Sequence, residues 1–188
     1  LLDGDDHVNA GAGNDDIYLG DGDDTAYAGS GNDNIYGGSG DDSIDGGGGN
    51  DTIDGGAGND TVKYQSAKAG ISVNLKTGAA SSADAGDAAQ IGIDTLVNIE
   101  NIVGGEFNDT LIGNASSNGI DGGLGIDTVI YDTAKVTTTK SSKSIFVNND
   151  TLNNIERIQF TDTSLAFDID GANSAGGIYR TYKAAFNR

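Results

Sequence analysis

The sequence lacks cysteine, proline, methionine and tryptophan, and it contains a single histidine. Without cysteine the chain has no disulfide bonds and no thiolate metal ligands, and a lone histidine argues against a transition-metal site. No apolar run approaches the roughly 20 residues of a membrane-spanning helix, so we expect no membrane span. The chain starts at Leu1 and no signal-peptide pattern follows, so we expect it to be a piece of a larger protein.

Glycine and acidic residues dominate what is present. The 188 residues include 31 glycines and 29 acidic against 10 basic side chains, which gives a formal net charge of −19. Aromatic residues make up only 6%, so few large side chains can offset the self-repulsion of a compact state. The charge argues against a nucleic-acid partner, because phosphates would be repelled. Multivalent cations held by oxygen ligands are the expected counter-charge.

A nine-residue repeat runs through residues 1–63 without a slip. The seven units read LLDGDDHVN, AGAGNDDIY, LGDGDDTAY, AGSGNDNIY, GGSGDDSID, GGGGNDTID and GGAGNDTVK. Place four is always Gly, place six is always Asp, and place eight is always apolar: Val8, Ile17, Ala26, Ile35, Ile44, Ile53 and Val62. A constant short period of this kind is the signature of a stacked-repeat fold.

Each place in the unit has a structural interpretation. Glycines at places one, two and four favour positive φ and a sharp turn, so the first six residues are expected to form a loop. Places seven to nine alternate polar, apolar, polar, which predicts a short strand with only the eighth side chain directed inward. Two units then form one coil of a parallel β-helix. One buried side chain in nine cannot offset the ordering entropy, so the loops have to add stability.

Stacking of the loops suggests how they do so. Sixth-place aspartates of units two apart should lie about one strand spacing, roughly 4.8 Å, from each other. Two bare carboxylates at this separation repel, whereas Ca²⁺ between them, with loop carbonyls completing its oxygen shell, makes the interaction attractive. Mg²⁺ fits less well because it requires a tighter octahedron.

The units resemble the G-G-x-G-x-D-x-U-x nonapeptide of RTX (repeats-in-toxin) proteins, where U is a large apolar residue. The resemblance implies an all-β parallel β-roll, with each Ca²⁺ held by the sixth-place Asp of two stacked loops and by carbonyls of the glycine-rich places. It pairs Asp6–Asp24, Asp24–Asp42 and Asp42–Asp60 on one edge and Asp15–Asp33 and Asp33–Asp51 on the other, about five ions. The implied carbonyl donors are Gly4, Gly11, Gly13, Gly20, Gly22, Gly29, Gly31, Gly37, Gly38, Gly40, Gly46, Gly47, Gly49, Gly55, Gly56 and Gly58.

The rest of the chain is less regular. Residues 64–103 leave the repeat, with strand-like stretches at 71–75 and 91–102. Three further units follow at 104–130, where Asp109 and Asp127, with Gly123 and Gly125, are expected to bind one or more ions. Asn118 stands where the middle unit should have Asp.

A longer duplication frames the second array, because DTLVNIENI at 94–102 returns as DTLNNIERI at 150–158. We interpret 131–172 as a degenerate β segment that caps the stack. The spacing of Ile178, Tyr182 and Phe186 predicts the start of a short amphipathic helix within 173–188.

The sequence predicts no catalytic activity. It contains no H-E-x-x-H, G-x-S-x-G or P-loop motif, and His7 occupies a solvent-facing seventh place. The paired aspartates are explained by the repeat, so they give no separate support to a glycosidase site.

Two functions stay open at this point. In the first, calcium outside the cell folds a secretion appendage of an exported hydrolase or toxin; the RTX resemblance implies a type I export machinery as partner, beside the remainder of the parent chain. In the second, the chain is an architectural segment of an adhesin or surface-layer protein. Both predict a secreted or bacterial cell-surface location. Ice binding through a flat repetitive face is a third, minor possibility. The sequence gives it little support, because places three and five lack a regular Thr and Asn ladder.

Overall fold

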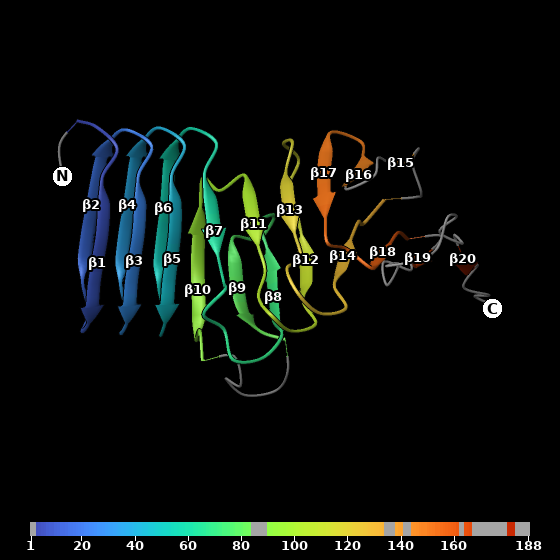
Figure 1. The fold of residues 1–188 in the computed structure, drawn as a ribbon, viewed down its shortest axis with the longest axis horizontal. Helices are drawn as coiled ribbons and strands as arrows, with labels where there is room; N and C mark the ends of the chain where they lie inside the picture. Colours follow the sequence, from blue (N-terminus) through green and yellow to red (C-terminus); the bar gives the residue numbers. More distant parts are fainter. Residues whose placement is uncertain are drawn as a thin grey trace.

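A computed structural model describes residues 3–83, 90–133, 138–140, 144–161, 164–166 and 180–182. These residues form two facing β-sheets joined by short turns. This part of the chain contains no helix, and so none long and apolar enough to cross a membrane. The strands lie side by side along one long axis, with the two sheets alternating from the N-terminus (Figure 1). The predicted all-β parallel roll is confirmed.

The strand order defines the two layers. Sheet I has the order β1 (His7–Ala12), β3 (Thr25–Ser30), β5 (Ser43–Gly48), β7 (Thr61–Lys63), β11 (Asn101–Val103), β13 (Gly119–Asp121), β17 (Asp150–Asn153), β16 (Ser144–Val147), β15 (Thr138–Lys140). Sheet II has the order β2 (Asp16–Asp21), β4 (Asn34–Ser39), β6 (Thr52–Ala57), β10 (Ile93–Val97), β9 (Ala79–Ser82), β8 (Ile71–Asn74), β12 (Thr110–Ile112), β14 (Thr128–Ile130), β18 (Arg157–Gln159), β19 (Ser164–Ala166), β20 (Arg180–Tyr182).

The pairing register follows the repeat. In sheet II, Ile17 pairs with Ile35 and Ile35 with Ile53, always in parallel and 18 residues apart. Sheet I has the same offset from β1 to β7. Two nonapeptides therefore make one coil, as predicted.

The strands of the first array are longer than predicted. β2 covers places seven to nine of one unit and places one to three of the next, and both Ile17 and Leu19 are buried. Positions two residues apart share one face of a strand, so the first place is directed inward as well as the eighth. Glycine does not end the strand, because Gly20 still pairs with Gly38 in the ladder. The expected six-residue loop is thus wrong for this array, and the loop is reduced to places four to six.

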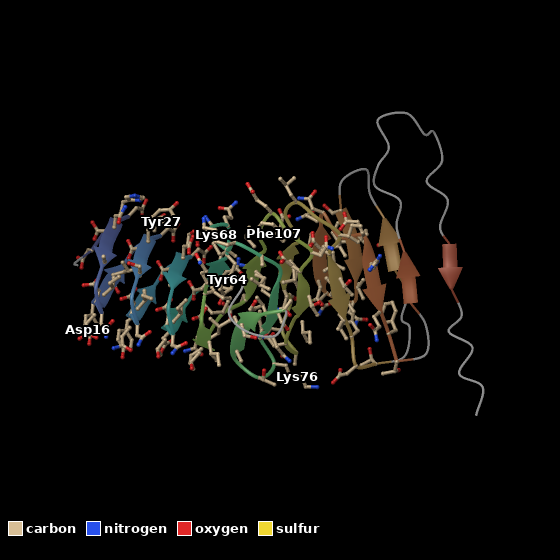
Figure 2. All side chains as sticks on the ribbon, turned by 90° about the horizontal axis from the view of Figure 1, so that it is seen from below. Asp16, Tyr27, Tyr64, Lys68, Lys76 and Phe107 are labelled. Atoms are coloured by element: carbon tan, nitrogen blue, oxygen red, sulfur yellow. The ribbon has the colours of Figure 1, made fainter. Side chains whose placement is uncertain are left out.

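Inward side chains form two continuous ladders between the sheets. Sheet I contributes Ala26, Ile44, Val62, Ile102, Ile120 and Leu152, and sheet II contributes Ile17, Ile35, Ile53, Leu96, Val73, Leu111, Val129 and Ile158. All are buried, and each large aliphatic side chain contributes about 1.5–3 kcal/mol on burial. Tyr27 and Asp16 lie on opposite outer faces of the molecule (Figure 2).

Two inserted units of the same kind follow the two arrays, one after each. In the first, β8, β9 and β10 form an antiparallel meander in sheet II, β10 joins β6 in parallel, and β11 continues sheet I beside β7. In the second, β15, β16 and β17 form the meander in sheet I, and β18 continues sheet II beside β14. The duplicated nonapeptide therefore marks one structural unit that is used on opposite faces of the roll. The strand β9 lies in a small-residue run where no strand was predicted.

The described C-terminal residues are strands. β19 pairs antiparallel with β18, and β20 pairs antiparallel with β19. The predicted helix is therefore wrong at Arg180–Tyr182, because sheet pairing outweighs the helical spacing of three apolar residues. Ile178 and Phe186, which the prediction also used, lie outside the described residues.

Candidate metal sites

Sixth-place aspartates stack on each other along both edges of the roll. The main-chain N–H of one aspartate donates to Oδ1 of the aspartate 18 residues further on, at 2.7–2.9 Å. These contacts join Asp6 to Asp24, Asp24 to Asp42, Asp42 to Asp60, Asp15 to Asp33 and Asp33 to Asp51. In the second array Asp109 donates to Asp127 in the same way, at 2.8 Å. The pairs expected from the sequence are thus brought together.

Fifth-place side chains also connect these stacked loops, but here the side chain of the earlier loop accepts the N–H of the later loop. The N–H of Asp23 donates to Oδ1 of Asp5, and Asp41 donates to Asp23. On the other edge the N–H of Asn32 donates to Asn14. One edge therefore carries two rows of carboxylates, whereas the other carries one carboxylate row beside a neutral amide row.

The second oxygen of the sixth-place aspartates is the unusual feature. The Oδ2 atoms of Asp15, Asp24, Asp33, Asp42, Asp51, Asp60 and Asp127 are buried and have no hydrogen-bond partner. Burying a carboxylate oxygen without a partner is costly unless a cation compensates it. All seven atoms belong to residues that the repeat pattern singles out as metal ligands.

The carboxyl pKa values reflect this environment. Burial raises the pKa of Asp42 and of Asp51 to about 6, although a main-chain N–H partly opposes the shift in each case. Burial likewise raises the pKa of Asp127 to about 7, with Asp109 and Glu156 as neighbouring charges that add to the shift. The metal-free loops therefore resist carrying their negative charge.

The glycines supply close-packed main-chain oxygens. At places two and four, Gly4, Gly11, Gly13, Gly20, Gly22, Gly29, Gly31, Gly38, Gly40, Gly47, Gly49, Gly56, Gly58, Gly123 and Gly125 all have positive φ. A Cβ at Gly31 would overlap the carbonyl oxygen of Gly13 in the loop below, and other stacked loops repeat this contact. Side chains are excluded here because carbonyl oxygens point along the stack.

The first-place glycines correct one expectation. Gly37, Gly46 and Gly55 do not have positive φ, so turning is not their role. Each instead lies against Oδ2 of the Asp in its own unit, and Gly37 also lies against the carbonyl oxygen of Gly55. Leu19 and Ala28 occupy this place in earlier units with buried side chains. The first place therefore closes the oxygen-lined space rather than bending the chain.

These donors fit a hard divalent cation. Among the described residues no three acidic or histidine side chains converge, so carboxylates can supply only part of any coordination shell. Main-chain carbonyls and carboxylate oxygens together are the ligand set of Ca²⁺, which accepts six to eight oxygens in flexible geometry.

The comparison with protein families agrees with this chemistry. The family described as RTX calcium-binding nonapeptide repeat (4 copies) matches residues 2–26, 27–62 and 98–129. These repeats belong to the RTX calcium-binding repeat family. They are accordingly a calcium-binding β-roll and form a structural module. A search of curated proteins finds no match to the chain.

Two glutamates at the ends of the RTX arrays were missed from the sequence. The N–H of Asp60 donates to Oε2 of Glu100 at 3.0 Å, and that of Asp127 donates to Oε2 of Glu156 at 2.7 Å. Each glutamate thus takes the position that the next sixth-place aspartate holds elsewhere.

Main-chain carbonyls beside the two glutamates also match those of the repeat units. The carbonyl of Asn98 lies against Gly55, and that of Asn154 lies against Gly122, as the carbonyl of Gly55 lies against Gly37. Both asparagines have positive φ. The shared tripeptide Asn-Ile-Glu at 98–100 and 154–156 was the available signal.

The second array has fewer unsatisfied carboxylates. Asp109 accepts the N–H of Ile71 on Oδ1 and that of Gly105 on Oδ2, so both of its oxygens have partners. Asn118 donates its side-chain N–H to the carbonyl of Glu100, at 2.9 Å. An amide donor therefore occupies the middle unit, where the sequence departs from the repeat.

Proposed function

We propose that this chain is the calcium-folded module of a larger exported protein. The observation that carries the proposal is the row of buried, partnerless Oδ2 atoms on the sixth-place aspartates. Bound Ca²⁺ supplies the positive charge that compensates these oxygens, and carbonyl oxygens of the loops coordinate it as well. The module has no catalytic role in this proposal.

The ligands are assigned by stacking. In the first array the five aspartate pairs that hydrogen-bond across 18 residues each hold one ion, together with carbonyls of the glycines at places two and four. Asp109 and Asp127 form a further site. Asp60 with Glu100, and Asp127 with Glu156, add one site at the end of each array.

The binding residues make calcium a folding switch. Residues 1–63 contain 15 acidic residues and one lysine, so without metal the array repels itself and stays disordered in cytosolic calcium. Such a chain can be threaded through a type I exporter. Outside the cell, calcium at the roughly 10⁻⁴–10⁻³ M range of extracellular modules folds it, and binding and folding are one equilibrium.

Far-UV circular dichroism of the 188-residue chain during a titration from EGTA to millimolar Ca²⁺ tests the switch. We expect a cooperative gain of β signal, with Mg²⁺ at equal concentration as the control that produces little change. A first array already folded in EGTA would show that the repeats are a static scaffold and would defeat the export argument.

An architectural segment of an adhesin or surface-layer protein is the second candidate. It is favoured by the uninterrupted stacking of strands along one axis from β1 to β14, which suits an extended spacer (Figure 1). The sequence of the parent gene discriminates the two: a catalytic domain beside the roll supports the first, and tandem repeat domains support the second.

A further inference from the structure

Two tyrosines, the buried Tyr64 and the partly buried Tyr131, follow the last strands of the arrays. Tyr64 comes directly after β7 and Tyr131 directly after β14, each at the first place of the unit that would come next. The hydroxyl of Tyr64 donates to Oδ2 of Asp94 at 3.0 Å, and that of Tyr131 donates to Oδ2 of Asp150 at 2.7 Å. Tyr64 and Asp94 are each 2% exposed, and Tyr64 lies within the body of the roll (Figure 2).

Asp94 and Asp150 occupy the positions of sixth-place aspartates. The N–H of Asp51 donates to Oδ1 of Asp94 at 3.1 Å, as the N–H of Asp33 donates to Asp51. The N–H of Asn118 donates to Oδ1 of Asp150 at 2.9 Å. One carboxylate oxygen is therefore held as it is throughout the repeats.

The second carboxylate oxygen, Oδ2, distinguishes Asp94 and Asp150 from the repeat aspartates. In seven repeat aspartates Oδ2 is buried without a partner, whereas in Asp94 and Asp150 a tyrosine hydroxyl donates to it. Burial and the adjacent carboxylate raise the pKa of both tyrosines, so the hydroxyls keep their protons. At these two aspartates a tyrosine hydroxyl therefore occupies the position that a cation would take at the repeat aspartates.

We propose that Tyr64 and Tyr131 take the place of calcium beside Asp94 and Asp150, so that the inserted units fold without metal and, at Asp94, end a row of calcium sites. The inference rests on the proposed calcium function of the neighbouring rungs. The two units close opposite sheets, since Asp94 lies in β10 of sheet II and Asp150 in β17 of sheet I. Each unit ends one edge with a tyrosine and the other edge with a glutamate, so metal-free and metal-dependent rungs lie next to each other.

Hydrogen–deuterium exchange of the whole chain, in EGTA and in saturating Ca²⁺, tests the inference. In EGTA we expect β10 and β17 to stay protected while β2 to β5 exchange rapidly. Tyr64→Phe removes the hydroxyl donor and should speed exchange of β10 in EGTA by about tenfold or more, because the buried Asp94 carboxylate loses one of its hydrogen bonds. Tyr36→Phe, which alters a partly exposed tyrosine, is the matched control and should change nothing.

The two proposals fail differently. If β2 to β5 gain no protection on addition of Ca²⁺, the folding switch fails, whatever happens at the tyrosines. If β10 and β17 exchange in EGTA as fast as β2 to β5, or if Tyr64→Phe behaves like Tyr36→Phe, the tyrosine inference is wrong. Tyr131→Phe gives an independent reading, because its effect must appear in β17 and leave β10 unchanged.

Discussion

At the scale of single residues, the sixth-place aspartate has two oxygens with different tasks. In Asp42, for example, the Oδ1 atom accepts a main-chain N–H from the preceding loop, which aligns the stack, and the Oδ2 atom is buried without a hydrogen-bond partner. Because one residue serves two loops, damage to it should spread to both.

Asp33→Ala measures this sharing. Asp33 accepts the N–H of Asp15 and donates its own N–H to Asp51, so two ions lose a ligand. We expect the calcium-bound state to be destabilised by about 3–5 kcal/mol, the range for removing one partner of a buried ion pair. The midpoint of denaturant unfolding, measured at a series of calcium concentrations, checks this value. Asp16→Ala, an exposed seventh-place control, should stay close to the parent chain.

Glu100→Gln tests the ligand that the repeat pattern does not contain. The amide keeps the size of the side chain but removes the charge facing Asp60, so the bound-ion count should fall by one. Metal analysis after gel filtration in dilute Ca²⁺ measures that count. The exposed Glu106→Gln is the control, and an unchanged count in both variants would remove Glu100 from the site.

The raised carboxyl pKa values predict how pH acts on the metal-free chain. Asp42 and Asp51 have a pKa of about 6 in the folded roll against 3.8 without burial, so the folded form binds protons more tightly than the unfolded chain. Stability conferred by protonation is present below about pH 4 and is lost as pH rises through 6. In EGTA we expect circular dichroism to show more β signal at pH 4.5 than at pH 7.5; the reverse trend would contradict the buried-carboxylate account.

At the scale of elements, the stacked turn depends on glycine for two separable reasons. Gly13 and Gly31 both stand at place four with nearly the same φ, 125° and 131°. No atom lies within 4 Å of a Cβ placed at Gly13, whereas a Cβ at Gly31 would overlap the carbonyl of Gly13. The two positions therefore separate backbone strain from collision.

Alanine substitutions should differ accordingly. Gly13→Ala should cost about 1–2 kcal/mol, the strain of a left-handed L-residue. Gly31→Ala should cost clearly more, because the carbonyl oxygens that line the candidate site must also move. Urea unfolding in saturating Ca²⁺ compares them, and equal losses would show that collision along the stack is unimportant.

At the scale of the whole molecule, the net charge of −19 opposes compaction in the absence of metal. Monovalent salt screens this repulsion beyond about 10 Å at 0.1 M but cannot bridge two carboxylates. We therefore expect 1 M NaCl in EGTA to reduce the hydrodynamic radius without restoring the β signal that millimolar Ca²⁺ produces. Gel filtration and circular dichroism on the same samples check both parts. Recovery of full β signal in NaCl alone would make calcium a counter-ion rather than a ligand.

Much of the architecture could be predicted because the repeat is local. The period of nine, the pairing of units 18 residues apart and the stacked aspartates follow from places four, six and eight. Strand length was mispredicted, because glycine was taken to end a strand that in fact continues through Gly20 and Gly38. The apolar spacing around Tyr182 suggested a helix, yet Arg180–Tyr182 pairs with β19, since an edge strand provides partners that a short helix lacks.

The sequence by itself determined the roll, its parallel register and the candidate ligands of the repeats, since each depends on residues that recur at one spacing. Only the tertiary structure decided which groups complete the ends. Glu100 reaches Asp60 across 40 residues, and Tyr64 reaches Asp94 across 30. No period relates these residues, because the meander β8–β9–β10 is laid down before the chain returns to stack on β6 and β7. Contacts of that kind depend on the path of the chain in space, which a repeat pattern does not encode.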